Sequence, residues 1–159
     1  FIPTPTTDTL TISSLYKNQA RVTLRGVVDK PGIAAEIFTA LAEKNINVDM
    51  IIHNVGQDGT TNLGFTIPQN ELHVAKECMD KLSASREILY NDEIVKVSVV
   101  GVGMKSHTGV ASLAFQTLAN EGINIQMIST SEIKISMIVD QKYGELAVRA
   151  LHEAYKLDK

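Results

Sequence analysis

Two short segments of this chain have residue types that can bind a small anionic group at the start of a helix. The first runs from Asp29 to Ala34, and the second from Gly109 to Ala111. The first N–H groups of a helix lack an intrahelical acceptor, and the helix dipole favours negative charge there, so each segment can bind a carboxylate. Glycine lets a ligand approach closely because it has no Cβ. Asp29 can pair with a cationic side chain or accept from a hydroxyl.

Two asparagine-containing segments supply the other half of that chemistry. Asn47-Val48 and Asn124-Ile125 each lead into a predicted strand, where backbone carbonyls and an amide side chain can receive an ammonium. A charged group that is buried needs such partners, because burying a charge alone is costly. A purely structural interpretation stays open: Asp29 can be a helix cap, Pro31-Gly32 a turn, and the asparagines helix-end residues.

An internal repeat relates these segments. Gly26 to Ile51 aligns with Gly101 to Ile128, and from Gly32 onward the matching residues lie 77 positions apart. The second copy has two extra residues in the loop before its helix. A repeat that spans a strand, a loop, a helix and the next strand predicts two copies of one small module.

Hydrophobic periodicity predicts the elements of each module. The first has strands near 20–28, 48–52, 63–67 and 88–90, and helices at 33–42 and 72–82. The second has strands near 94–100, 125–130 and 133–139, and helices at 110–119 and 146–155. It is one strand short, and the strand pattern at 10–15 has no place in the first module, so this strand is assigned to the second sheet.

The predicted fold class is therefore α+β, with two ferredoxin-like β-α-β-β-α-β modules. We expect the first module to span residues 16–92, and the second to combine 93–159 with the strand at 10–15. Residues 1–9 are expected to be a mobile lead-in.

Composition excludes several classes of function. The chain has 159 residues, 44% of them hydrophobic, and a net charge of −3. It lacks a run of basic residues, which argues against nucleic-acid binding, and a stretch of ~20 apolar residues, which argues against a membrane span. The start resembles no signal peptide and has no initiator Met, so a fragment or processed chain is expected. With Cys78 as the only cysteine, a cytoplasmic location is the default.

The sequence contains no recognisable catalytic set. There is no Gly-rich phosphate loop of the Walker type, and the histidines at 53, 73, 107 and 152 lack partners at metal-ligand spacing. Ser106-His107 and the hydroxyl residues from Ser129 to Ser131 are nucleophile types without a third orienting group. We expect no metal site and no cofactor in this chain.

Several segments resemble a known family. The DKPG loop followed by NINVD, and the KSHTG loop followed by GINIQ, resemble the ACT domain, which binds small ligands, mostly amino acids. NVGQDGTTNLGFTIP, VVGVGMKSHTGV and IQMISTSEIKIS look like the tandem ACT region of aspartate kinase. The resemblance covers about residues 10 to 157, and nothing like the catalytic KFGGTS-type strand is present.

The resemblance implies a regulatory region that senses lysine, threonine or both in feedback control of aspartate phosphorylation. It also implies a homodimer through ACT modules and a catalytic aspartate kinase domain as partner, with ATP and Mg bound only on that absent domain. Effectors would lie at interfaces between modules. The effector-binding residues carried over are Asp29, Lys30, Pro31, Gly32, Ile33, Ala34, Asn47, His53, Val110, Ala111, Asn124, Ile125, Thr130 and Ser131.

Three positions depart from the family pattern. His53 stands where Gln is expected, and Gly56 and Gly64 replace polar residues. An imidazole can still donate or accept one hydrogen bond, but a dimerisation module with weak or lost effector binding is therefore the alternative. Thr130 and Ser131 can also simply form a hairpin corner. A third alternative, an independent enzyme on this scaffold, has no catalytic set to support it.

Overall fold

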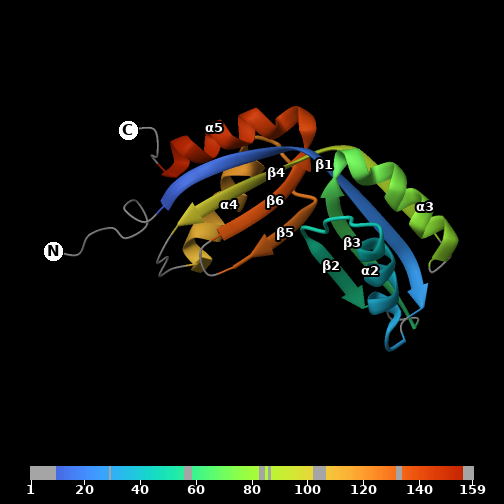
Figure 1. Ribbon diagram of the computed structural model, residues 1–159. Coiled ribbons are helices and arrows are strands. Elements are labelled where there is room, and N and C mark those ends of the chain that lie inside the picture. The colour runs from blue at the N-terminus through green and yellow to red at the C-terminus, as the bar shows by residue number, and fades with distance from the viewer. Residues whose placement is uncertain are drawn as a thin grey trace. The chain divides into compact units, whose positions relative to one another are not determined.

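The computed structural model describes residues 10–28, 30–55, 59–82, 85, 87–101, 107–131 and 134–155. The strands are β1 (Leu10–Val28), β2 (Ile51–Val55), β3 (Thr60–Pro68), β4 (Glu87–Gly101), β5 (Met127–Thr130) and β6 (Lys134–Asp140). The helices are α2 (Ile33–Glu43), α3 (Leu72–Leu82), α4 (His107–Asn120) and α5 (Gly144–Tyr155). Two short 3-10 turns, η1 (Gln69–Glu71) and η2 (Gln141–Tyr143), precede α3 and α5. Figure 1 labels these elements.

The chain divides into two compact units. One, the first unit, is formed by Asn18–Asp92. The other, the second unit, joins the described residues up to Lys17 to those from Glu93 onward. Each unit consists of antiparallel strands and two helices, α2 and α3 in the first unit and α4 and α5 in the second (Figure 1).

The first unit has the strand order β2-β3-β1-β4, to which β4 contributes its residues Glu87 to Asp92. β1 pairs with β3 from Gln19–Pro68 to Val28–Thr60, with a bulge between Leu24 and Val27. Alternate residues of β1 are buried, as the sequence pattern predicts, and they meet the apolar stripes of α2 and α3. The rings of Phe38 and Phe65 pack edge to face, 5.5 Å between centroids. The core residues are Ala20, Val22, Leu24, Val27, Ile37, Leu41, Ile46, Leu63, Phe65, Ile67, Leu72, Ala75, Cys78 and Met79.

The second unit has the strand order β1-β4-β6-β5. Leu15 of β1 packs against its core, and an added Cβ at Gly144 would lie 3.0 Å from the Leu15 Cδ1 atom. The predicted ferredoxin-like fold, with the N-terminal strand completing the second sheet, is confirmed. The core residues are Val95, Val97, Val99, Val110, Ala114, Leu118, Ile123, Ile135, Met137, Val139, Ala147, Leu151 and Tyr155.

Two strand predictions were too short. The patterns at 10–15 and 20–28 belong to one strand of 19 residues, β1, and those at 88–90 and 94–100 belong to one strand of 15 residues, β4. The polar residues between the patterns suggested loops. Between the two patterns of β1, Asn18 has a φ of 63° and stays within the strand, because asparagine tolerates this left-handed backbone better than most residues.

The repeat is visible in the turn that ends the first helix of each unit. The Asn45 N–H donates to the Ala42 carbonyl at 2.9 Å, and the Gly122 N–H donates to the Ala119 carbonyl at 3.0 Å. Asn45 and Gly122 both have positive φ, 58° and 72°. Residues 77 positions apart thus build the same helix-ending turn, which confirms that the two modules share one backbone design.

Candidate functional site

The loop after β1 presents the start of α2 to solvent. The Ile33 N–H donates to the Lys30 carbonyl at 3.3 Å, and the Glu36 N–H donates to the Gly32 carbonyl at 3.0 Å. Gly32 precedes the helix with a φ of 87°, and no described side chain caps it. Apart from Gly32 itself and its two chain neighbours, no atom of the described residues lies within 4 Å of where a Gly32 Cβ would be. The N–H groups of Ala34 and Ala35 have no recorded acceptor among the described residues, so an incoming carboxylate has open access to them.

The residues of this loop are exposed as the sequence analysis requires. Lys30, Pro31, Gly32 and Ala34 are exposed and Ile33 is half-buried. Asp29, the predicted partner for a cation or a hydroxyl, lies outside the described residues.

The C-terminal end of β2 lies at the same end of the sheet as this loop. Val28 pairs with Thr60, and Val55 pairs with Thr61 beside it. The Thr61 hydroxyl donates to the Asn54 carbonyl at 2.6 Å and fixes that end of β2. His53 is opposite Leu63, a core residue, so its imidazole is on the helix-bearing side of the strand, where it is exposed.

Asn47 lies at the other end of the first unit. It follows the C-terminus of α2, an 11-residue helix about 16 Å long at 1.5 Å per residue. The Asn47 N–H donates to the Glu71 carboxylate at 3.5 Å, and the Asp49 N–H, two residues later, donates to the Thr66 carbonyl. The exposed Asn47 and the β1–α2 loop are therefore not brought together within one unit.

In the second unit, the helix begins earlier than the repeat predicts. The first helix of the repeat was expected from Val110, but α4 starts at His107. Val110 is buried and Ala111 half-buried, and in a regular α-helix the Ala111 N–H bonds to the His107 carbonyl. The loop that leads to the start of α4, residues 102–106, lies outside the described residues.

Thr130 and Ser131 sit at a hairpin corner of the second unit. Val100 pairs with Lys134 and Thr130 with Ile135, so this corner lies at the end of the sheet from which the chain passes to α4. The Ser131 N–H donates to the Lys134 carbonyl at 2.8 Å, and the Ser131 hydroxyl accepts from the Lys134 N–H at 3.2 Å. The Ser131 side chain thus has a structural use in the turn, while exposed Thr130 remains available.

Asn124 and Ile125 repeat the arrangement of Asn47. They follow the C-terminus of α4, and the adjacent Gln126 N–H donates to the Ile138 carbonyl at 2.7 Å. Asn124 is exposed, whereas Ile125 packs against the core. In both units the asparagine segment and the helix start therefore lie at opposite ends of a helix.

Sequence analysis missed a pair of amides near the first loop. Asn54 of β2 is directly opposite Asn62 of β3, and the Asn62 side-chain oxygen accepts from the Gly26 N–H at 3.3 Å. Both are exposed. The Asp58-Gly59 hairpin signal could have found them, because a hairpin centred on Asp58 pairs these two positions. Their amide groups are additional candidates for contacting the polar groups of a ligand.

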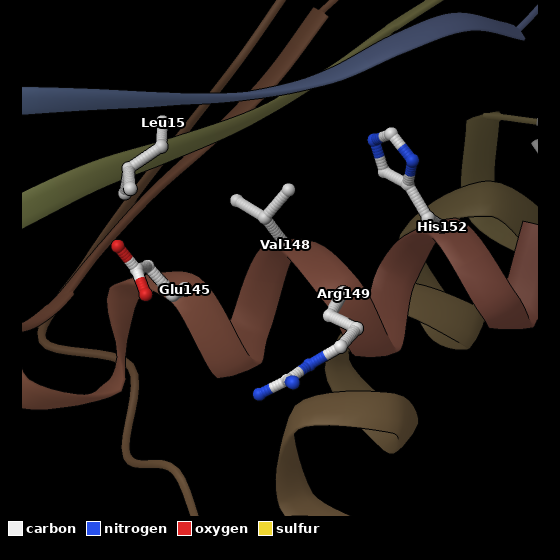
Figure 2. Close-up of a pocket in the computed structure, with 5 residues that line it drawn as sticks. All are labelled: Leu15, Glu145, Val148, Arg149 and His152. Carbon is white, nitrogen blue, oxygen red and sulfur yellow. The ribbon is translucent and has the colours of Figure 1, made fainter. Parts of the chain in front are cut away.

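A pocket of about 410 Å³ lies elsewhere, within the second unit. It is lined by Leu15 of β1 and by one stripe of α5, namely Glu145, Val148, Arg149 and His152 (Figure 2). Val148 extends toward β1, whereas Arg149 extends from the opposite side of the helix in this view. Glu145 forms an exposed ion pair with Lys17 at 3.8 Å. None of the residues predicted from the sequence lines this pocket.

Arg21 of β1 forms no ion pair with the described residues. Arg21 is half-buried beside Thr66, and its Nε atom is buried without a hydrogen-bond partner among the described residues. Burial, and secondarily the charge of Arg25, lower the pKa of Arg21 from its ordinary value. Arg25 itself pairs with Glu87 at 3.4 Å.

Among the described residues there is no group of three His, Cys, Asp or Glu side chains placed to hold a metal ion. Nor does any helix in the described part of the chain have the length and apolar character needed to cross a membrane.

Comparison with known proteins places this geometry in context. The ACT domain family matches residues 22–81 and 97–155. The aspartokinase of Helicobacter pylori strain 26695 is 58% identical over 147 residues, which are 92% of this chain and 36% of the relative. The chain thus spans about a third of the length of that relative.

Two solved structures are similar over nearly their whole length. A chain from the crystal structure of aspartokinase alpha and beta subunits is 50% identical, with a TM-score of 0.87, and the match covers 92% of this chain and 99% of that chain. The regulatory subunit of aspartate kinase from Thermus thermophilus, in a ligand-free form, is 40% identical, with a TM-score of 0.86 and coverages of 92% and 98%.

Proposed function

Because this chain belongs to the ACT domain family, as the tandem ACT regulatory region of an aspartokinase, we propose that it binds lysine, threonine or both as feedback effectors. The observation that carries the proposal is the exposed start of α2. There a helix N-terminus that no described side chain caps follows a glycine with open space beside it, at the end of a sheet whose edge strand is β2.

The chemistry of a free amino acid fits this place. Its carboxylate binds the N–H groups at the start of α2, since these are oriented donors at the positive end of the helix dipole. Its ammonium needs carbonyl or amide oxygens, which strand-edge segments with asparagine supply. His53 and the amides of Asn54 and Asn62 then contact the effector's side chain and determine which amino acid is preferred.

One unit alone does not complete the site. The β1–α2 loop and Asn47 lie about 16 Å apart along α2, whereas a backbone zwitterion spans only a few ångströms. We therefore propose that the asparagine segment facing a given loop comes from a different ACT unit. The affinity for the effector then depends on how the units are arranged, and regulation requires such a dependence.

Two exposed isoleucines support association through sheet edges. Ile51 of β2 is 53% exposed and Ile128 of β5 is 42% exposed, and the two residues occupy equivalent positions of the repeat. β2 and β5 are the terminal strands of their units, and edge strands with exposed apolar side chains favour pairing with another chain. A homodimer through ACT units is the proposed assembly.

Regulation follows from differential binding. An effector that binds one arrangement of the units more tightly shifts the population toward it, and coupling of ~1–3 kcal/mol is typical. The phosphorylation of aspartate, with its ATP and Mg, is proposed to belong to a catalytic kinase part with which this region associates.

Isothermal titration of the chain with lysine and threonine, singly and together, tests the proposal. Ala34→Glu is the matched variant, because Ala34 is exposed and a carboxylate in the first turn favours the helix while it competes with the effector's carboxylate. We expect at least one of the two amino acids to bind, and Ala34→Glu to remove binding at the first unit without lowering the melting temperature. Absence of heat and of a melting shift with both amino acids would refute the proposal.

The second candidate is a dimerisation module with weak effector binding. It is favoured by the exposed Ile51 and Ile128 and by His53 at the strand edge. Sedimentation separates the two candidates: a dimer that forms equally with and without amino acids, in a chain that binds neither, supports the second. An Ile51→Lys variant that still dimerises would exclude β2 from that interface.

A further inference from the structure

The pocket between β1 and α5 takes no part in the proposed effector sites. Its volume of about 410 Å³ lies within the range of small-molecule pockets, about 300–1,000 Å³. The five residues that line it all belong to the second unit, and four of them form one stripe of α5. Small-molecule pockets combine an apolar floor with a few polar groups at defined places, and this pocket has both.

The floor of the pocket is aliphatic and consists of Leu15 of β1 and Val148 of α5. Both side chains are half-buried and pack against the core of the second unit. In Figure 2, Val148 extends toward β1 and Leu15 toward α5. Gly144 keeps the helix close to the strand, since an added Cβ would lie 3.0 Å from the Leu15 Cδ1 atom. Packing therefore fixes the floor, and its shape suits an aliphatic group.

Charged groups of both signs stand at the rim of the pocket. Glu145 and Arg149 are exposed and four positions apart on α5, so their Cβ atoms are neighbours about 5–6 Å apart. An acid and a base at this spacing can pair with each other, yet no ion pair joins these two. The Glu145 carboxylate lies 3.8 Å from the Lys17 Nζ atom instead, and in Figure 2 Arg149 extends to the other side of the helix.

A free amino acid with an aliphatic side chain matches these groups. Its ammonium and carboxylate lie only a few ångströms apart, as do an acid and a base one helical turn apart. The ammonium can replace Lys17 at Glu145 at little cost, because an exposed ion pair contributes little. The carboxylate can accept a bidentate pair of hydrogen bonds from the Arg149 guanidinium. The aliphatic side chain then covers Leu15 and Val148 and removes apolar surface from water.

The same lining disfavours other small ligands. A carboxylate without an ammonium leaves the negative charge of Glu145 opposed to it, and an amine without a carboxylate leaves Arg149 opposed to it. A charged side chain, as in lysine, would lie over the aliphatic floor, and burying that charge is costly. His152 ends the stripe seven residues after Glu145, about 10 Å along the helix. Side chains of the size of leucine or methionine fit this length.

We propose that this pocket binds aliphatic amino acids such as leucine, isoleucine or methionine. Glu145 binds the ammonium, Arg149 binds the carboxylate, and the floor binds the side chain. This inference goes beyond the proposed function and does not depend on it, because none of the predicted effector residues lines the pocket.

Isothermal titration of the whole chain with the three amino acids tests the proposal, together with matched ligands and variants. Leucinamide lacks the carboxylate, 4-methylpentanoate lacks the ammonium, and glycine lacks the side chain. Glu145→Gln and Arg149→Gln each remove one rim charge at an exposed position. Glu153→Gln is the control, because Glu153 is an exposed acid of the same helix that is not among the lining residues. Thermal melting confirms that each variant folds.

We expect at least one of the three amino acids to bind with a Kd below about 1 mM. Leucinamide, 4-methylpentanoate and glycine should bind about tenfold more weakly or worse, since each lacks a charge pair or the apolar contact. Glu145→Gln and Arg149→Gln should each raise the Kd about tenfold, the effect of losing a hydrogen bond to a charged group. Glu153→Gln and Ala34→Glu should leave the Kd unchanged.

Four results would overturn the proposal. They are absence of binding by all three amino acids, equal binding of leucine and either of its two analogues, an unchanged Kd in Glu145→Gln or Arg149→Gln, and loss of leucine binding in Ala34→Glu. The last result would assign leucine to the first unit's effector site. A chain that binds leucine in this pocket but neither lysine nor threonine refutes the proposed function alone, so the two failures are distinguishable.

Discussion

Substitutions at Gly122 test which residue types the turn after α4 accepts at its left-handed position. Gly122 ends the turn after α4 with a φ of 72°, and no atom lies within 4 Å of an added Cβ. A substitution therefore meets no steric obstacle, and its cost is the backbone conformation alone. For alanine, left-handed backbone costs about 1–2 kcal/mol, of which about 0.5–1 kcal/mol is recovered from the lower entropy of the unfolded chain.

The first unit supplies the matched comparison. Asn45 occupies the equivalent position with a φ of 58° and donates the equivalent hydrogen bond. Asparagine adopts this backbone more readily than other residues with a Cβ. We therefore expect Gly122→Asn to lower stability by less than ~0.5 kcal/mol, Gly122→Ala by about 1 kcal/mol, and Gly122→Val by about 2 kcal/mol because it is β-branched.

Urea denaturation followed by circular dichroism measures these differences, and thermal melting should show shifts of about 2–4 °C per kcal/mol. The wild-type chain and an Asn45→Gly variant, which should be nearly neutral, are the controls. Equal effects of asparagine, alanine and valine would refute the reasoning, because backbone conformation would then not be the source of the cost.

Three further predictions follow from packing and protonation. Gly144→Ala should lower the free energy of unfolding by about 1–2 kcal/mol in urea denaturation. The added Cβ would lie 2.9 Å from Cγ2 of buried Val95, and this overpacking outweighs the gain in helix propensity. A stabilised variant would contradict this. Ser98 and Ser136 share a buried hydrogen bond of 2.9 Å between their hydroxyls. In the same assay, each single alanine variant should therefore lower the free energy of unfolding by about 1–3 kcal/mol, and the double variant by less than the sum of the two. Strictly additive effects would show that this hydrogen bond does not contribute to stability. Burial raises the pKa of Tyr155, whose hydroxyl donates to the Val110 carbonyl, from 10.0 to about 12, so its contribution to folding stability is fully present below pH 10 and is lost as the pH rises toward 12. In pH-dependent melting, the wild-type chain should therefore lose more stability over that interval than Tyr155→Phe. Parallel curves for the two proteins would refute the assignment.

The repeat made the fold predictable. Matching residues at a spacing of 77 predicted two ferredoxin-like units, and the missing strand of the second unit identified the role of the strand at 10–15. Asn45 follows the apolar stripe of the helix predicted at 33–42, and asparagine is typical of the left-handed position that it adopts at the helix end. These features depend on periodicity and turn chemistry, which are local.

The lengths of β1 and β4 were not predictable in the same way. Asn18 and the polar residues after Tyr90 break the alternation and indicate loops, but β1 and β4 each continue through these places as one strand. The early start of α4 was missed for a related reason. His107, Thr108 and Gly109 have low helix propensity, and the support from Tyr155 lies 45 residues away from Val110.

The candidate site was partly accessible from sequence. The geometry of Gly32 and the exposure of Ala34 agree with the predicted helix start, whereas the binding roles of these residues stay predictions. That Asn47 lies at the far end of α2 from the loop could also have been deduced, because a helix of this length separates its two ends. The family resemblance, which places effectors between units, is the source of the proposal that different units share one site.

The two long strands constrain how this region can be divided or recombined. A fragment beginning at Glu93 would lack the only strand that pairs with β4 on the side away from β6, although every other strand of that sheet is present. A gene that encodes only the part from Glu93 onward therefore lacks one strand of that sheet. A second unit that is transferred to another protein must therefore keep the residues of β1 up to Lys17. A circular permutation that joins these residues to the part beginning at Glu93 would meet this requirement.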